Sequence, residues 1–273
     1  MFVLSPLDGV FRDNPPRAYW RGRSLTALTD GQLPLELLED VGALLGRAEL
    51  LKDSRTTKAG LATLPDGRRV FVKRYNIKTP LYALKYFFRP ARPFKAWRAA
   101  WLLRQGGLPT PAPHAAVSER RHGALRAAYL LTEALEGVVP PPAFFAAADP
   151  AALVAALCST LAKAHGLGVA HGDCKLSNFF FSDWAKGGFA CGLWDFDGAA
   201  VRPSQTLAAR EAELARALAS LAAETLKAGQ APDIPALADL FVEQYGRSCG
   251  LRPRRAALLA MAGGHLERNR KKR

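Results

Sequence analysis

The segment Val169-Ala-His-Gly-Asp-Cys-Lys-Leu-Ser-Asn-Phe-Phe-Phe181 carries more chemical information than any other part of this chain, and Leu193-Trp-Asp-Phe-Asp-Gly198 follows it. Its pattern His-Gly-Asp-x-Lys-x-x-Asn presents a carboxylate, an ammonium and a carboxamide within six residues. Apolar residues flank the pattern, so we expect a polar loop held between two short strands. The second segment adds the carboxylates of Asp195 and Asp197 at the end of an apolar run.

These residue types match the needs of phosphoryl transfer. A carboxylate can accept the proton of an attacking hydroxyl, a cation can neutralise the transferring group, and Asn and Asp oxygens can hold Mg²⁺. The plainer interpretation is a turn capped by His171 and Asp173 and closed by Asn178. The second acidic motif, which follows after strand-like residues, favours the catalytic interpretation.

The chain resembles the protein-kinase-like superfamily, whose catalytic loop reads H-x-D-x-K-x-x-N before a metal-binding D-F-G. The resemblance implies that Asp173 is the catalytic base and that Lys175 neutralises transferring charge. It also implies that ATP is the donor and that Asn178 and Asp195 bind Mg²⁺. The implied fold is α+β and two-lobed, with a small antiparallel sheet in the N-lobe and a mainly helical C-lobe.

Length and composition allow two lobes in this chain of 273 residues, 49% of them hydrophobic. We predict an N-terminal extension over residues 1–46, an N-lobe over 47–136, and a C-lobe with a basic tail over 137–273. No apolar run reaches the roughly 18 residues of a spanning helix, and the N-terminus lacks signal-peptide features. These absences predict a cytoplasmic protein. The four cysteines have no paired spacing that would indicate zinc or a disulfide framework.

The predicted N-lobe sheet contains three consecutive strands. Residues 48–64 have the pattern of strand, turn and strand, and residues 69–75 alternate as a third strand that carries Lys73. The resemblance implies that Lys73 contacts the α- and β-phosphates of ATP and that the turn over 53–58 covers them. This turn lacks G-x-G-x-x-G, so its hydroxyls and cations would have to hold phosphate: Ser54, Arg55, Thr56, Thr57 and Lys58.

Two further features concern nucleotide binding. In a kinase-like lobe Lys73 should pair with a glutamate on the following helix, but no acidic residue occurs between Asp66 and Glu119. Another group, for which Asp195 is the candidate, would then orient Lys73. Residues 129–136 are predicted to be a buried strand that enters a Pro-rich hinge, and the resemblance implies that backbone groups near Glu133 and Leu135 meet the adenine edge.

Apolar residues at helical spacing predict helices over residues 35–45, 93–105, 150–166, 204–227, 234–245 and 254–262. Asp149-Pro150 is a capping pair, and His165 is interpreted as a helix-terminal histidine rather than a ligand. Two of these helices have predicted packing faces: Leu153, Leu157 and Leu161 on one, and Leu207, Leu214, Leu218 and Leu221 on the other. Cys174 is expected to fill an apolar slot.

The net charge of +14 is unevenly spread, with fourteen basic residues and one acidic residue between positions 68 and 126. Such an excess implies a polyanionic partner, and no nucleic-acid-binding motif accompanies it. Residues 82–104 interleave aromatic rings with cations, a mixture that suits a membrane interface. We predict a peripheral protein on the inner face of the cytoplasmic membrane, which Phe87 and Phe88 contact, whereas Trp97 and Trp101 belong to the core.

Gly172 occupies the position at which many protein kinases carry an arginine that binds a phosphorylated activation loop. The chain also has no room for a full activation segment. H-G-D-x-K-x-x-N with D-F-D, the segment Gly107-Leu-Pro-Thr-Pro111 and the length most resemble the bacterial lipopolysaccharide kinase family. This resemblance implies phosphorylation of a heptose or Kdo hydroxyl on the core oligosaccharide of lipid A. The alternatives are a pseudokinase scaffold, which the missing helix glutamate favours, and a small-molecule kinase of the antibiotic or choline type.

Overall fold

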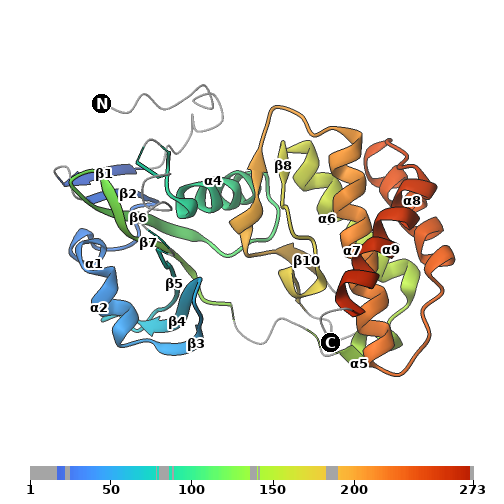
Figure 1. Cartoon of the computed structure of the whole chain (residues 1–273), viewed down its shortest axis with the longest axis horizontal. Helices are drawn as coiled ribbons and strands as arrows, with labels where there is room; N and C mark the ends of the chain where they lie inside the picture. Colours follow the sequence, from blue (N-terminus) through green and yellow to red (C-terminus); the bar gives the residue numbers. More distant parts are fainter. Residues whose placement is uncertain are drawn as a thin grey trace. The chain divides into compact units, whose positions relative to one another are not determined.

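The structure is a computed structural model that describes residues 17–21, 25–77, 79, 86–87, 89–135, 140, 142–182 and 190–270. The chain separates into two compact units, one of Met1–Leu102 with Pro111–Leu135 and one of Leu103–Thr110 with Glu136–Arg273. The first contains an antiparallel sheet and the second is mainly helical, which confirms the predicted α+β class (Figure 1). The three predicted domain ranges remain predictions.

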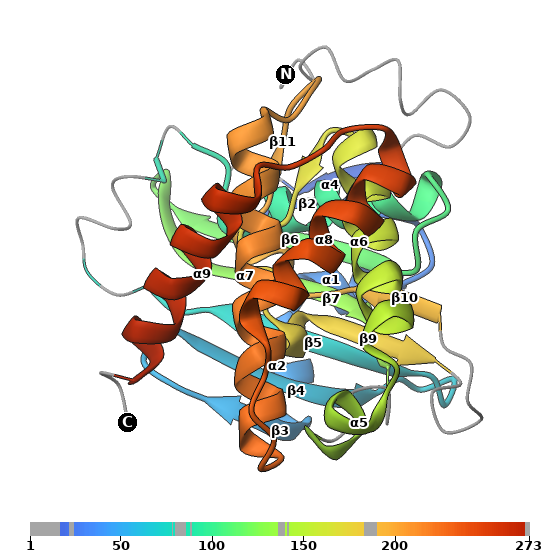
Figure 2. The ribbon, with the colours of Figure 1, turned by 90° about the vertical axis from the view of Figure 1, so that its right-hand side faces the viewer.

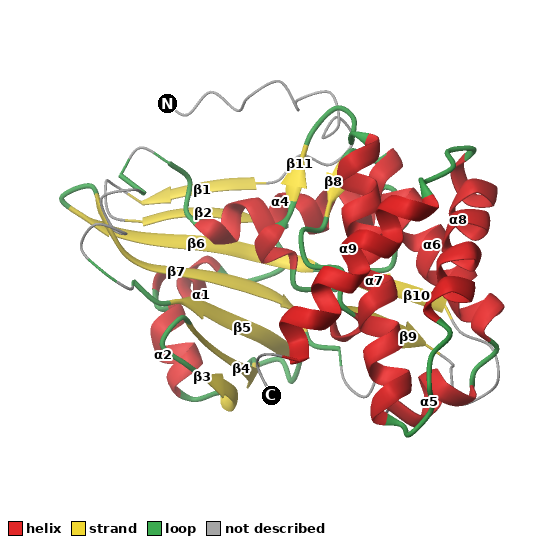
Figure 3. Cartoon of the chain, turned by 45° about the vertical axis from the view of Figure 1, so that its right-hand side comes forward, coloured by secondary structure: helices red, strands yellow, loops and turns green. Residues whose placement is uncertain are grey.

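One seven-stranded antiparallel sheet organises the first unit, in the order β1-β2-β6-β7-β5-β4-β3 (Figure 3). Its strands are β1 (Arg17–Arg21), β2 (Leu25–Thr29), β3 (Glu49–Asp53), β4 (Thr57–Thr63), β5 (Arg69–Tyr75), β6 (Pro113–Arg121) and β7 (Ala124–Glu133). The three consecutive strands predicted from the sequence are β3, β4 and β5. Strands β1, β2 and β6 were not predicted. Strand β6 is rich in alanine, which has little strand preference, and β1 and β2 are too short to show a strong alternating pattern.

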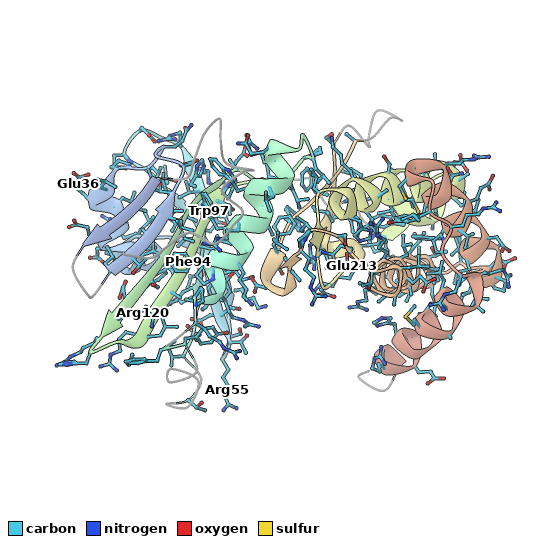
Figure 4. All side chains as sticks on the ribbon, turned by 90° about the horizontal axis from the view of Figure 1, so that it is seen from above. Glu36, Arg55, Phe94, Trp97, Arg120 and Glu213 are labelled. Atoms are coloured by element: carbon cyan, nitrogen blue, oxygen red, sulfur yellow. The ribbon has the colours of Figure 1, made fainter. Side chains whose placement is uncertain are left out.

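Three helices cover the two faces of this sheet: α1 (Leu35–Glu39), α2 (Val41–Gly46) and α4 (Arg92–Gln105). The single helix predicted over 35–45 is wrong. Asp40 leaves the helical conformation and its side chain caps α2 by accepting the Ala43 N–H at 2.9 Å, so two short helices form instead. Figure 4 shows Glu36 of α1 on one side of the strands and Phe94 and Trp97 of α4 on the other.

Each face of the sheet has its own apolar packing. Leu38 of α1 and Leu44 of α2 join Val70 and Val72 of β5 in one buried cluster. On α4, Trp97 and Trp101 are buried and stack with their ring centroids 4.8 Å apart, which confirms the prediction that these two rings belong to the core.

The second unit is built from helices α5 (Pro142–Ala147), α6 (Pro150–Gly166), α7 (Leu207–Lys227), α8 (Ile234–Cys249) and α9 (Arg255–Arg270). Figure 2 shows α7 with α9 beside it on one side and α8 on the other. Asp149 caps α6 as predicted by accepting the N–H groups of Ala151 and Ala152. No helix in the described part of the chain combines the length and the apolar character that crossing a membrane requires.

Most of the predicted leucine faces are correct. Leu153, Leu157 and Leu161 of α6 are fully buried, and so are Leu214 and Leu218 of α7. The exception is Leu207, which is 38% exposed. It is the first residue of α7, directly after the N-cap Thr206, and a side chain in this first turn extends beyond the core that the rest of the helix covers.

Candidate active site

The polar loop over residues 171–178 lies between the short strands β8 (Val169–Ala170) and β9 (Phe179–Ser182), as predicted. Strand β9 pairs with β10 (Ala190–Leu193), and Phe179 is opposite Leu193. The next residue, Trp194, donates its N–H to the carbonyl of Asn178 at 3.1 Å. The pairing therefore brings the backbone of Asn178 beside the residue that precedes Asp195.

The carboxylate of Asp173 lies between two cations. Its Oδ1 accepts a hydrogen bond from Nε of Arg216 at 3.1 Å, and its Oδ2 is 3.5 Å from Nζ of Lys175. Asn178 fixes the loop from the other side by donating its Nδ2 to the Asp173 carbonyl at 2.8 Å. The Asp173 side chain is nevertheless 43% exposed. A carboxylate that is held in place and still accessible can serve as a general base.

The buried side chain of His171 holds the loop in place. Its Nε2 donates to the Trp194 carbonyl at 2.8 Å, and its Nδ1 accepts the Asp173 N–H at 3.3 Å. These two bonds fix the neutral tautomer that carries its proton on Nε2. The buried ring also packs on Phe196, at 5.1 Å between centroids. His171 thereby connects Asp173 to the segment that carries Asp195.

Asn178 and Asp195 supply oxygen atoms of the kind that Mg²⁺ prefers. Because Asn178 uses its Nδ2 for Asp173, its carboxamide oxygen is directed to the opposite side. Asp195 has φ 61° and ψ 60°, a left-handed conformation that costs a non-glycine residue about 1–2 kcal/mol and that recurs at functional sites. The described residues contain no group of three His, Cys, Asp or Glu side chains that could hold a metal. Two protein oxygens still fit Mg²⁺, which keeps waters and phosphate oxygens as its other ligands.

Lys73 lies on β5, where it pairs with Ala59 of β4 and Leu130 of β7. Alternation along the strand places it on the same face as Tyr75 and on the face opposite Val72. Its Nζ lies 5.5 Å from the centroid of the Tyr75 ring. Helix α4 carries no acidic residue, so Lys73 has no glutamate partner on that helix.

The turn between β3 and β4 is closed by its own side chains. Ser54 Oγ donates to the Thr57 carbonyl at 2.9 Å and accepts the Thr57 N–H at 3.2 Å. The Ser54 hydroxyl is therefore used inside the turn, and Thr57 is buried. Arg55 and Thr56 are both exposed in this turn, and Figure 4 shows Arg55 extending from it. They are the better placed of the predicted phosphate-binding residues.

The predicted hinge begins at the end of β7. The Glu133 N–H donates to the Ala112 carbonyl at 2.8 Å, and the Glu133 carbonyl accepts the Thr132 hydroxyl at 3.1 Å. Since both backbone groups of Glu133 have these partners, Leu135 is the more suitable of the two predicted adenine contacts.

Three polar residues of α7 support the polar loop over residues 171–178, and the sequence analysis missed all three. Glu213 accepts the Gly172 N–H, Arg216 binds Asp173, and Ser220 Oγ accepts the Leu176 N–H at 2.9 Å. Their spacing of three and four residues puts them on one face of the helix. The spacing is visible in the sequence, but it does not show that this face of the helix meets the loop.

Glu213 also ends a buried chain of hydrogen bonds. Arg210 donates to the Tyr245 hydroxyl at 3.3 Å, Tyr245 bonds Nδ1 of His165 at 2.8 Å, and Nε2 of His165 bonds Glu213 at 2.9 Å. Burial by itself would raise the pKa of Glu213, but the hydrogen bonds from His165 and the Gly172 N–H outweigh it and lower that pKa. His165 lies in the last turn of α6, as predicted, and its hydrogen bonds to Tyr245 and Glu213 fix its ring there.

Gly172 is required by the path of the loop. Its φ is +85°, and a side chain there would collide with the backbone carbonyl of Gly198. An arginine, which many protein kinases carry at this position, therefore does not fit.

Cys174 fills a fully buried slot in the loop, as predicted. Burial, followed by the nearby Glu213 carboxylate, raises the pKa of its thiol. The thiol thus stays protonated and does not take part in the chemistry of the loop.

Glu213→Gln is expected to lower the free energy of unfolding by about 1.5–3 kcal/mol at neutral pH, because one of two charge-assisted hydrogen bonds is lost. The folded-state pKa of Glu213 lies below its ordinary value of 4.5. Its stabilisation is therefore complete above that pH and is lost as the pH falls through the lowered pKa. Urea denaturation of both proteins across the acidic range measures the difference.

Glu243→Gln is the matched control, since Glu243 belongs to an exposed ion pair with Arg247 on α8 and such pairs contribute little. If both variants lose the same stability with the same pH dependence, the role assigned to Glu213 is wrong.

A family model described as the lipopolysaccharide kinase (Kdo/WaaP) family matches residues 49–235. Among solved structures, the chain is similar to WaaP in complex with acyl carrier protein, with 22% identity, a TM-score of 0.59, and coverage of 85% of this chain and 91% of that one. No curated protein matches.

Two other kinases have a similar fold. Amicoumacin kinase hAmiN in complex with AMP-PNP, Ca²⁺ and Ami is 11% identical, with a TM-score of 0.51 and coverage of 88% of this chain and 93% of that one. The Rio2 kinase-ADP/Mg²⁺-phosphoaspartate complex from Chaetomium thermophilum is 14% identical, with a TM-score of 0.50 and coverage of 98% and 85%. At these identities the structural likenesses establish the fold alone.

Proposed function

We propose, because the chain belongs to the lipopolysaccharide kinase (Kdo/WaaP) family, that it phosphorylates a hydroxyl of a heptose or Kdo residue in the lipopolysaccharide inner core. Membership of this family makes the chain an ATP-dependent phosphotransferase. The observation that carries the finer assignment is the Asp173 carboxylate, which Arg216, Lys175 and Asn178 hold in place while it remains accessible.

In the proposed mechanism Asp173 accepts the proton of the sugar hydroxyl as that oxygen attacks the terminal phosphorus of ATP. The bond from this phosphorus to the bridging oxygen breaks, and ADP leaves with that oxygen. Lys175, 3.5 Å from Asp173, neutralises charge that develops on the transferring group. Phosphoryl transfer asks for little covalent help from the protein, so positioning and charge stabilisation account for most of the catalysis.

The same proposal assigns the residues that hold nucleotide and metal. Asn178 and Asp195 would ligate Mg²⁺, which when bound neutralises phosphate charge. Lys73 would contact the α- and β-phosphates. Backbone groups at Glu133 and Leu135 would receive the adenine, and the turn residues would cover the phosphates: Ser54, Arg55 and Thr56. The Ser54 hydroxyl is bonded inside its turn, which makes Arg55 and Thr56 the better candidates for phosphate contact. The backbone of Glu133 already has partners, which makes Leu135 the better candidate for adenine contact.

Incubation of the full chain with labelled ATP, Mg²⁺ and lipopolysaccharide from strains that lack single core sugars tests this function. Lipopolysaccharide that contains the acceptor sugar should become labelled, and lipopolysaccharide from the strain that lacks this sugar should not. Aminoglycoside and choline acceptors in parallel test the small-molecule alternative. ATP binding without transfer to any acceptor would instead favour the pseudokinase alternative, which the absence of an acidic residue from α4 supports.

An anionic membrane surface is the further partner that we propose. Phe87 is 42% exposed and its ring lies over Gly123, at the turn between β6 and β7. Arg120 fixes this contact by donating to the carbonyls of Tyr86 at 2.7 Å and Gly123 at 3.0 Å. Three exposed arginines occur nearby. Arg89 lies two residues after Phe87 in the sequence, and Arg121 and Arg126 lie on the hairpin of β6 and β7. Phe88 and residues 80–85, including Tyr82 and Lys85, lie outside the described residues.

Phe87→Ser is expected to weaken sedimentation with anionic vesicles at low salt without unfolding the protein. Each cation near an anionic surface adds about 1 kcal/mol of attraction, and salt screens it. Leu51→Ser is the control, since Leu51 is 56% exposed on β3. Equal sedimentation with neutral and anionic vesicles would contradict the proposal.

A further inference from the structure

An open pocket of about 490 Å³ lies beside Asp173, with all of its lining residues in the second unit. The loop contributes Gly172 and Asp173, α7 contributes Arg216, and α9 contributes His265 and Arg268. Small residues of α7, among them Ala212, leave the space between the two helices open. The candidate base therefore opens onto a cavity of the size that binds small molecules.

Both carboxylates of the pocket are already occupied. Glu213 directs its two oxygens to Gly172 and His165, and Asp173 is shared between Arg216 and Lys175. Arg216 uses its Nε for Asp173. Within the described residues, the terminal guanidinium nitrogens of Arg216 have no hydrogen-bond partner, so this side chain can bind Asp173 and a ligand in the pocket at the same time.

His265 and Arg268 form the opposite wall. Arg268 donates to Nδ1 of His265 at 3.1 Å, which leaves the His265 proton on Nε2. Burial, then the charges of Arg216 and Arg268, lower the pKa of His265, although Asp173 opposes the shift. At neutral pH the pocket thus combines two guanidiniums with a neutral imidazole donor.

We propose that this pocket is the acceptor site, and that Arg216, His265 and Arg268 bind an anionic group of the acceptor next to the hydroxyl that Asp173 deprotonates. The inference rests on the proposed function and narrows its substrate class to sugars that carry a carboxylate or a phosphate near the reacting hydroxyl. Arginine suits both groups, because its planar fork matches their paired oxygens. Since Arg216 contacts Asp173 directly, an anion on Arg216 positions the acceptor close to the base.

The kinetic test uses the full chain with ATP, Mg²⁺ and two pairs of acceptors. One pair is a Kdo glycoside and its methyl ester, and the other is a heptose glycoside with and without a phosphate on a neighbouring hydroxyl. The charged member of one pair should have a kcat/KM about 10- to 100-fold above its neutral counterpart, the effect of a charge-assisted hydrogen bond. Which pair shows the preference identifies the source of the anion.

Arg268→Gln should remove most of this preference by raising the KM for the charged acceptor while the KM for ATP stays unchanged. Arg247→Gln is the matched control, because Arg247 is an exposed arginine on α8 outside the pocket. Equal use of charged and neutral acceptors by the wild-type chain would overturn the inference and leave the proposed function intact.

A second measurement does not depend on catalysis. In NMR titrations of the full chain, inorganic phosphate should raise the pKa of His265, because a bound anion favours the imidazolium. The shift should be smaller in Arg268→Gln and unchanged in Arg247→Gln. If no acceptor of either pair is phosphorylated, the proposed function fails. An unchanged His265 titration shows that the pocket does not bind anions and overturns the inference by itself.

Discussion

Asp173→Ala is expected to lower kcat by about 10²- to 10⁴-fold, the usual cost of removing a general base. The affinity for ATP should stay largely intact, because Lys73 and the residues assigned to adenine lie elsewhere in the sequence. Asn178, assigned to Mg²⁺, bonds the backbone carbonyl of residue 173, which alanine retains. The substitution also removes the anion that Arg216 and Lys175 share. Single-turnover kinetics with the lipopolysaccharide acceptor, together with calorimetric titration of Mg²⁺-ATP, separate the two effects.

Asp173→Asn is the more conservative variant, since its carboxamide retains the shape and one acceptor for Arg216. It should be nearly as inactive as Asp173→Ala, because an amide does not accept the proton. Near-full activity of either variant on the true acceptor would show that the base has been misassigned.

Asp195→Asn is expected to weaken Mg²⁺-ATP binding by at least about tenfold, since even indirect disturbance of a metal site costs 10- to 100-fold. Asparagine tolerates the left-handed conformation of Asp195, so this variant changes the ligand and spares the backbone. Asp195→Ala would combine the lost ligand with backbone strain. Calorimetric titration of ATP at several Mg²⁺ concentrations measures the loss.

Asp197→Asn is the control for charge, because Asp197 lies two residues away in the same acidic motif. Unchanged Mg²⁺ dependence in Asp195→Asn would contradict the assignment of Asp195 as a metal ligand. A loss of equal size in Asp197→Asn would show that the total negative charge of the motif matters more than one ligand.

The features that the sequence predicted correctly are local ones. The polar loop between β8 and β9, the strands β3 to β5 and the cap of α6 at Asp149 each depend on residues within a few positions of one another, so their patterns are visible in a single segment. Strand β6 was missed because its alanines have little strand preference. In the structure its pairing with β2 and β7 outweighs that local preference.

The missed residues of the candidate site depend on contacts between distant segments. Glu213, Arg216 and Ser220 are about 40 residues from the loop groups they bind. The sequence shows the leucines of α7 as a packing face, but it does not show which of the remaining faces meets the loop. For the same reason, the sequence analysis did not identify His265 and Arg268 as site residues, whereas α9 carries both into the wall of the pocket.

The buried thiol of Cys174 has a practical consequence for experiments on this protein. Cys158 and Cys191 are buried as well, and burial raises the pKa of both thiols, that of Cys191 to about 12. Cys249, at the end of α8, is exposed. Alkylating reagents act on thiolates, so a maleimide dye or spin label should attach at Cys249 and spare the catalytic loop. The unaltered sequence thus offers a single attachment point for spectroscopic probes.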